Sequence, residues 1–123
     1  MRKITIGLLL TLFVSSIFSQ NKVVGYFPSY GDASRIQWDK ITDIVYGFGI
    51  VSTSGDITIQ DSDKFATIVT LAKSNGVRII LACGGAEQSG NFSILAASSS
   101  ARTNFANDIS AFDTQYGLDG FDL

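Results

Sequence analysis

The stretch YGLDGFDL, residues 116–123, decides which fold is expected for the whole chain. Asp119 and Asp122 lie three positions apart in an otherwise apolar segment, with Gly120 between them. Gly117, the second residue of the segment, belongs to the residue type that most often ends a helix, because glycine adopts a left-handed conformation freely. No turn signal follows within the segment, so we predict a strand after that glycine. The upstream elements determine which strand of which sheet it is.

Three upstream segments have the composition of buried strands. β-Branched and aromatic residues dominate them, and nearly continuous apolar runs are typical of strands covered on both faces. The segments are KVVGYF at 22–27, ITDIVYGFGIV at 41–51 and VRIILACGG at 77–85. Pro28, the only proline of the chain, is predicted to end the first. The turn STSGD at 52–56 follows the second.

Two amphipathic helices are predicted between these strands and the final one. The first begins at Asp61 or Ser62, whose side chains can cap free backbone N–H groups, and ends at Gly76. The second begins at 98–100 and ends at Gly117. Their apolar faces carry Phe65, Ile68, Val69 and Ala72 in the first, and Phe105, Ile109, Phe112 and Tyr116 in the second.

This order of elements predicts an α/β fold. Consecutive buried strands that are joined by helices pair in parallel through right-handed crossovers. Two architectures fit the pattern: an open doubly wound sheet, or the first half, about four βα units, of a (β/α)8 TIM barrel.

The first 19 residues have the layout of a secretory signal peptide. Arg2 and Lys3 precede an apolar run at 4–14, and small residues lie near Ser19. The run is shorter than the roughly 20 residues that a membrane-spanning helix needs, and an uncleaved N-terminal anchor is the alternative. We therefore expect a mature chain from residue 20 that is secreted to the extracellular space or a periplasm, without membrane association after cleavage.

Charge and residue types narrow the chemistry of the mature chain. Without the leader, seven basic residues face eleven acidic ones, and this mildly acidic balance argues against nucleic acid and anionic membranes as partners. The 123 residues contain no histidine and one cysteine, Cys83, in an apolar context. Histidine catalysis, histidine metal sites and an internal disulfide are thereby excluded within this sequence. We expect chemistry carried by carboxylates, with neither a metal nor a cofactor.

Four segments, taken in order, make the sequence resemble glycoside hydrolase family 18, the chitinase and endo-β-N-acetylglucosaminidase group. VVGYFPSY at 23–30 is similar to the first barrel strand of that family, and 41–51 is similar to its second. Residues 77–85 are similar to its third strand, which commonly closes in S-x-G-G. LDGFDL at 118–123 is similar to the start of its fourth-strand signature, D-G-x-D-x-D-x-E. The resemblance covers 20–123 and implies a barrel whose signature is cut at residue 123, with its third aspartate and catalytic glutamate beyond.

The resemblance also implies a reaction and a site. The reaction is substrate-assisted retaining hydrolysis of β-1,4-linked N-acetylglucosamine, with chitin or a related oligosaccharide as the partner. Asp122 would support the aspartate that orients the substrate's acetamido group. Asp119 lies three positions before Asp122, so its side chain would point to the other face of the strand. We therefore expect a structural role for Asp119. Tyr26 and Phe48 would line the innermost sugar subsite, since aromatic faces stack on pyranose rings.

Several alternatives stay open at the level of sequence. Ala82 stands where the family usually has serine, which is compatible with an active enzyme or with a chitin-binding lectin that does not cleave. Gly84 and Gly85 fit a tight strand-to-loop turn as well as they fit room for a sugar ring. Gly120 matches the signature, although Asp-Gly alone is a common turn pair. A nucleotide-binding domain would need a helix directly after a glycine-rich turn, which 47–49 lacks.

Overall fold

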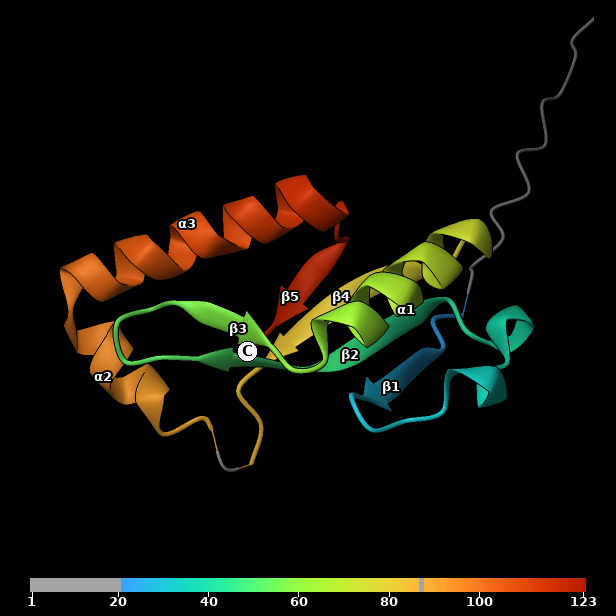
Figure 1. The fold of residues 1–123 in the computed structure, drawn as a ribbon, viewed down its shortest axis with the longest axis horizontal. Coiled ribbons are helices and arrows are strands. Elements are labelled where there is room, and N and C mark those ends of the chain that lie inside the picture. Colours follow the sequence, from blue (N-terminus) through green and yellow to red (C-terminus); the bar gives the residue numbers. More distant parts are fainter. Residues whose placement is uncertain (1–20, 87) are drawn as a thin grey trace, which may run out of the picture.

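The computed structural model describes residues 21–86 and 88–123, so the predicted signal peptide at 1–19 lies outside the described part. The elements follow one another as β1 (Val24–Pro28), 3-10 turns η1 (Ala33–Arg35) and η2 (Trp38–Lys40), β2 (Asp43–Val51), β3 (Ile57–Ile59), α1 (Ser62–Ser74), β4 (Arg78–Cys83), α2 (Asn91–Ala97), α3 (Ser99–Tyr116) and β5 (Gly120–Asp122) (Figure 1). No helix within these ranges is long and apolar enough to cross a membrane.

Four strands form a single parallel sheet in the order β1-β2-β4-β5, and β3 pairs antiparallel with the end of β2. The parallel strands keep their order in the sequence, and α1 and α3 contribute to the same buried cluster on one face of the sheet. A doubly wound sheet would reverse its strand order and place helices on both faces. The singly wound order is that of a (β/α)8 barrel. It confirms the predicted α/β class and favours the barrel over the open doubly wound sheet.

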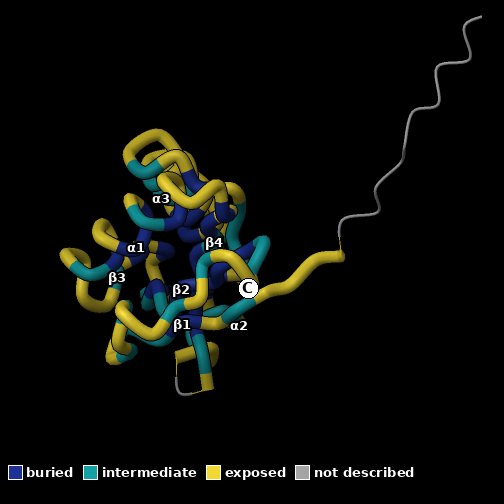
Figure 2. The backbone as a smooth tube through the Cα atoms, turned by 90° about the vertical axis from the view of Figure 1, so that its right-hand side faces the viewer, coloured by how far each residue is buried: buried dark blue, intermediate teal, exposed yellow. Residues whose placement is uncertain are grey.

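Strand register divides the sheet into two faces. Phe27, Tyr46 and Leu81 are aligned on neighbouring strands and buried beneath the helices. Figure 2 shows buried residues gathered where β2 and β4 run close to α1 and α3. The opposite face carries two rows, one with Tyr26, Val45, Ile80 and Gly120, the other with Pro28, Gly47, Ala82 and Asp122. This second face is the one that a barrel turns toward its axis.

Both predicted helices form with the expected ends. Asp61 caps α1 by accepting a hydrogen bond from Lys64 N at 3.1 Å, and Gly76 follows the helix with φ +68°. Ser98 caps α3, and Gly117 ends it with φ +57°. The residues buried as predicted are Phe65, Ile68, Val69, Ala72 and Phe105, while Ile109, Phe112 and Tyr116 are partly buried against the same core.

Three details differ from the expectation. Pro28 is the last residue of β1 rather than the residue after it, because β1 pairs on one side only among the described residues and needs no donor there. The turn at 52–56 leads into β3, which is held by Ile57 N donating to Asp108 Oδ2 at 2.8 Å. The loop after β4 contains α2, anchored by Asn91 Nδ2 donating to the Val51 carbonyl at 2.8 Å.

An ion pair between buried Asp43 and Arg78, whose side chain is 45% exposed, closes the N-terminal end of the sheet. Asp43 is only 2% exposed, and the Arg78 guanidinium of the adjacent strand donates to its carboxylate. Thr42 Oγ1 donates to the other carboxylate oxygen at 2.6 Å. The pair joins the first residue of β2 to the first residue of β4, and so fixes their register.

Candidate functional site

The carboxyl ends of the parallel strands meet at one edge of the sheet, where barrel enzymes carry out their chemistry. Asp122 on β5, Ala82 on β4 and Gly47 on β2 lie in one register row at this edge. Of the sequence-predicted residues, Asp122 lies in this row and Tyr26 lies one row deeper, in register with Val45. Phe48 follows Gly47 within β2, and Gly84 and Gly85 follow the end of β4. The fold thus places them at the end where a site is expected.

Tyr26 and Asp122 are in direct contact, although 96 residues separate them. The phenol of Tyr26 donates a hydrogen bond to Asp122 Oδ2 at 2.8 Å. On a flat sheet β1 and β5 would lie about 14 Å apart, three strand spacings. The sheet must therefore curl toward this face, as the wall of a barrel does. The contact was not predicted, although both residues belong to the barrel-facing set of their strands.

Asp122 also changes the ionisation of its partner. The hydrogen bond to the Asp122 carboxylate, together with its negative charge, raises the pKa of Tyr26 above the ordinary value of 10.0. The phenolate would place a second negative charge beside the first, which is unfavourable. Tyr26 therefore stays a hydrogen-bond donor to Asp122 throughout the neutral range.

That coupling gives a direct test of the contact. Asp122→Asn removes the negative charge, so we expect the pKa of Tyr26 to fall toward its ordinary value. The phenolate absorbance, recorded against a Tyr26→Phe reference, measures this pKa. Asp113→Asn, which neutralises an exposed carboxylate on α3, should leave it unchanged. An identical titration of Tyr26 in the Asp122 variant and the wild type would contradict the contact.

Asp119 occupies a different environment from Asp122. Its carboxylate accepts a hydrogen bond from Ile79 N at 2.9 Å, and its own N–H donates to Ile79 O at 2.8 Å. These two bonds attach the start of β5 to β4, which is the placement that a structural role requires. A Cβ at Gly120 would meet Ile80 at an ordinary 3.9 Å, so sterics among the described residues do not require glycine there.

Gly84 and Gly85 form the tight turn after β4. Their φ angles of +101° and +99° lie where other residues are strained. A Cβ at Gly84 would lie 2.8 Å from the Phe92 ring, and one at Gly85 would lie 3.3 Å from the Phe48 ring. Backbone conformation thus accounts for both glycines. The lack of a side chain at Gly85 also leaves room for the Phe48 ring.

Tyr26 and Phe48 line one hollow of about 250 Å³ at this edge, together with Phe27, Pro28, Tyr30 and Gly47. Tyr26 is 67% exposed and Tyr30 88% exposed, whereas Phe48 is half-buried. The Gly47–Phe48 peptide bond is cis. The hollow is smaller than the roughly 300–1,000 Å³ typical of drug-sized ligands, so its size suits one ring better than a chain of them.

A larger hollow of about 600 Å³ lies at the opposite end of the strands, lined by Trp38, Asn75 and Arg78 among others. We place the candidate site at the smaller one, because barrel enzymes react at the carboxyl ends of their strands. In the described part of the chain, no three carboxylate or thiol side chains gather as metal ligands. Burial, with a smaller effect of the Asp122 charge, raises the pKa of the Cys83 thiol to about 11, so it is not a nucleophile at neutral pH.

Comparisons with a family model and with known proteins agree on one family. The sequence model described as "Glycosyl hydrolases family 18" matches residues 22–123. A "chitinase-like effector" of Moniliophthora roreri is 30% identical over 104 residues, which are 80% of this chain and 26% of that protein. "Probable chitinase 10" of Drosophila melanogaster is 28% identical over 123 residues, 85% of this chain and 5% of that protein.

Solved structures agree with the sequence comparison. A chitinase of Rhizomucor miehei superimposes with a TM-score of 0.77 at 32% identity, over 82% of this chain and 32% of the other. A chitinase of Bacteroides thetaiotaomicron gives 0.72 at 25% identity, over 81% and 34%. The Group IV chitinase of Ostrinia furnacalis in complex with allosamidin shares the fold, with a TM-score of 0.73 at 24% identity, over 82% and 32%. This chain thus spans about a third of the solved chitinases.

Proposed function

The chain belongs to family 18 of the glycosyl hydrolases, and from this premise we propose that the whole protein is a secreted, chitinase-like enzyme. Its substrate is a polymer or oligomer of β-1,4-linked N-acetylglucosamine, cleaved with retention of configuration. The observation that carries the proposal is the Tyr26–Asp122 hydrogen bond beside a hollow lined by aromatic side chains. Secretion rests on the predicted leader at 1–19.

In the proposed reaction, the carbonyl oxygen of the substrate's own acetamido group attacks the anomeric carbon. The new carbon–oxygen bond forms as the glycosidic bond breaks, and the leaving oxygen takes a proton from the glutamate of the family signature. Water then opens the cyclic intermediate and restores the acetamido group. That glutamate, and the aspartate that orients the acetamido group, would follow Asp122 at spacings of four and two.

Asp122 is proposed as the carboxylate that supports the orienting aspartate. Residues two apart on a strand share a face, so the next signature aspartate would lie on the same barrel-facing side. Two carboxylates at that distance do not both ionise readily, which favours one shared proton between them. Tyr26 keeps Asp122 itself in place by donating to one of its oxygens.

A non-catalytic lectin on the same barrel is the second candidate, and Ala82 is the observation that favours it. Ala82 lies in register with Asp122, where a serine would offer a hydroxyl to the carboxylate. Without that donor, the described residues hydrogen-bond the Asp122 carboxylate only through Tyr26. An endo-β-N-acetylglucosaminidase would use the same machinery on a different glycan.

The experiment is to incubate the full-length protein with oligomers of N-acetylglucosamine and to follow products and their anomeric form by NMR. We expect turnover with the β-anomer formed first. Residues 20–123 alone should give none, because the signature glutamate is not among them. Binding of oligomers without turnover would replace the enzyme by the lectin. A protein that neither binds nor cleaves them, but releases glycans from glycoproteins, would be the endoglycosidase.

A further inference from the structure

Two backbone hydrogen bonds hold the Gly47-Phe48 pair. Ser29 N donates to Gly47 O at 2.7 Å, and Gln60 N donates to Phe48 O at 3.1 Å. Ser29 belongs to the loop after β1, whereas Gln60 follows β3, so the two donors come from segments that are not continuous. The position of the Phe48 ring in the hollow depends on both segments.

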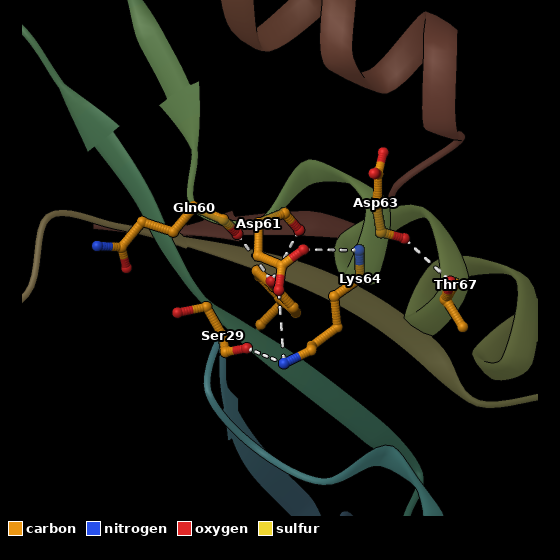
Figure 3. A network of polar contacts seen from close by, with 7 residues as sticks. Ser29, Gln60, Asp61, Asp63, Lys64 and Thr67 are labelled. Carbon is orange, nitrogen blue, oxygen red and sulfur yellow. Dashed lines mark hydrogen bonds and ion pairs between the residues drawn. The ribbon is translucent and has the colours of Figure 1, made fainter.

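Lys64 on α1 connects these segments (Figure 3). Its Nζ donates to Ser29 O at 2.5 Å and lies 3.5 Å from Asp61 Oδ2. Asp61 directly follows Gln60, and its Oδ1 accepts from Lys64 N at 3.1 Å. The lysine thus spans from the loop after β1 to the segment after β3.

Tyr46 completes the connection from beneath. Its hydroxyl donates to Gln60 O at 2.8 Å and lies 3.1 Å from Asp61 O. Burial, with a smaller effect of the Asp61 charge, raises the pKa of Tyr46 to about 12, so the phenol remains a donor. Ser29, Tyr46, Gln60, Asp61 and Lys64 together are called the clamp below.

The Lys64 contact differs from an ordinary surface ion pair. Its side chain is 30% exposed, and its charge is met by one carboxylate and one carbonyl. Ordering a lysine side chain costs conformational entropy, while a partly buried, charge-assisted hydrogen bond is about twice as strong as a neutral one. The contact therefore holds the loop after β1 more firmly than a solvated pair would.

We propose that Lys64 is a positioning residue for the candidate site. By tying Ser29 to Asp61, it fixes the distance between the wall that contains Pro28 and Tyr30 and the segment that holds Phe48. Pro28, Tyr30 and Phe48 all line the hollow. The inference rests on the proposed function for its ligand, an oligomer of β-linked N-acetylglucosamine. In this role Lys64 affects how well the sugar ring binds and does not take part in bond cleavage.

Lys73 supplies a matched control on the same helix. Its Nζ also donates to a backbone carbonyl of a distant segment, that of Tyr116, but at the end of α1 remote from the hollow. Lys73→Met therefore removes the same kind of contact without touching the clamp. Lys64→Arg keeps a charged donor and tests whether the contact, rather than the lysine stem, is required.

The experiment compares Lys64→Met, Lys64→Arg and Lys73→Met in the full-length protein with an N-acetylglucosamine tetramer as the probe. We expect Lys64→Met to raise KM about tenfold, the loss typical of one charge-assisted hydrogen bond, with kcat nearly unchanged. Lys64→Arg should recover most of the loss, and Lys73→Met should show none. Amide exchange at Ser29 and Gln60 should accelerate in Lys64→Met relative to Leu81, which reports on the core.

The two readouts separate this inference from the proposed function. Wild-type KM and wild-type exchange at Ser29 and Gln60 in Lys64→Met would overturn the positioning role. A KM defect of equal size in Lys73→Met would also overturn it, because general loss of stability would then explain both. A wild-type protein that neither binds nor cleaves the tetramer would contradict the proposed function, and the role of the clamp in sugar binding with it.

Discussion

Asp122→Asn in the full-length protein is expected to lower kcat about 100-fold, the scale of losing one group that supports proton transfer in an active site. Asparagine keeps the shape of the side chain and can still accept the hydrogen bond from Tyr26. It cannot carry the negative charge that would hold a proton on the neighbouring signature aspartate. The change therefore affects the transition state, while the aromatic walls that bind the sugar stay in place.

Steady-state kinetics on an N-acetylglucosamine oligomer measure this effect, with KM expected to remain within about threefold of wild type. Asp113→Asn is the control, since it neutralises an exposed carboxylate of α3. A wild-type kcat in Asp122→Asn would remove Asp122 from the site. A raised KM with unchanged kcat would make it a binding residue instead of a supporting carboxylate.

Arg78→Met is expected to lower the free energy of unfolding by about 2 kcal/mol, less than for a fully buried pair because the Arg78 side chain is 45% exposed. Arg78 is the counter-ion of Asp43, whose side chain is 3% exposed. Removing the guanidinium leaves a buried carboxylate with the Thr42 hydroxyl as its remaining donor, 2.6 Å away. An unpaired buried charge costs far more than the pair itself contributes, so most of the loss is the cost of leaving Asp43 alone.

Urea unfolding gives the free energy directly, and the chain provides its own comparison. Lys40 and Asp39 form an ion pair at 2.7 Å in which both side chains are about 70% exposed. Lys40→Met should cost less than about 0.5 kcal/mol, as solvated pairs do. The double variant Asp43→Asn/Arg78→Met should recover part of the loss, because no charge is then buried. Equal stability of Arg78→Met and Lys40→Met would show that Asp43 is not held by Arg78.

The sequence predicted the strands and helices that have strong periodic signals. The apolar runs around Tyr46 and Leu81, and the helix ends at Gly76 and Gly117, are local features that survive folding unchanged. The two missed elements, β3 and α2, are too short for periodicity to mark them. They form because distant residues hold them, Asp108 for β3 and the Val51 carbonyl for α2.

For the candidate site, the sequence predicts residues but not the contacts between them. The signature placed Asp122 and the strand ends placed Tyr26 and Phe48, yet nothing local joins the first strand to the last. Lys64 could not be found at all, since its partner is a backbone carbonyl and any residue at position 29 offers one. Asp43 did carry a signal, as a lone charge within an apolar strand, which is typical of a buried pair.

The strand order also bears on how the protein is made. Each parallel strand pairs with one that has already been synthesised, so the sheet can assemble in the order in which the chain leaves the ribosome. The bond from Tyr26 to Asp122 has the longest sequence span of the side-chain hydrogen bonds among the described residues, because Tyr26 waits for a residue 96 positions later. Until then, the phenol of Tyr26 lacks its Asp122 acceptor, although Tyr26 stays 67% exposed once the bond has formed. The aromatic group proposed to receive the sugar is thus among the last to gain its native partner.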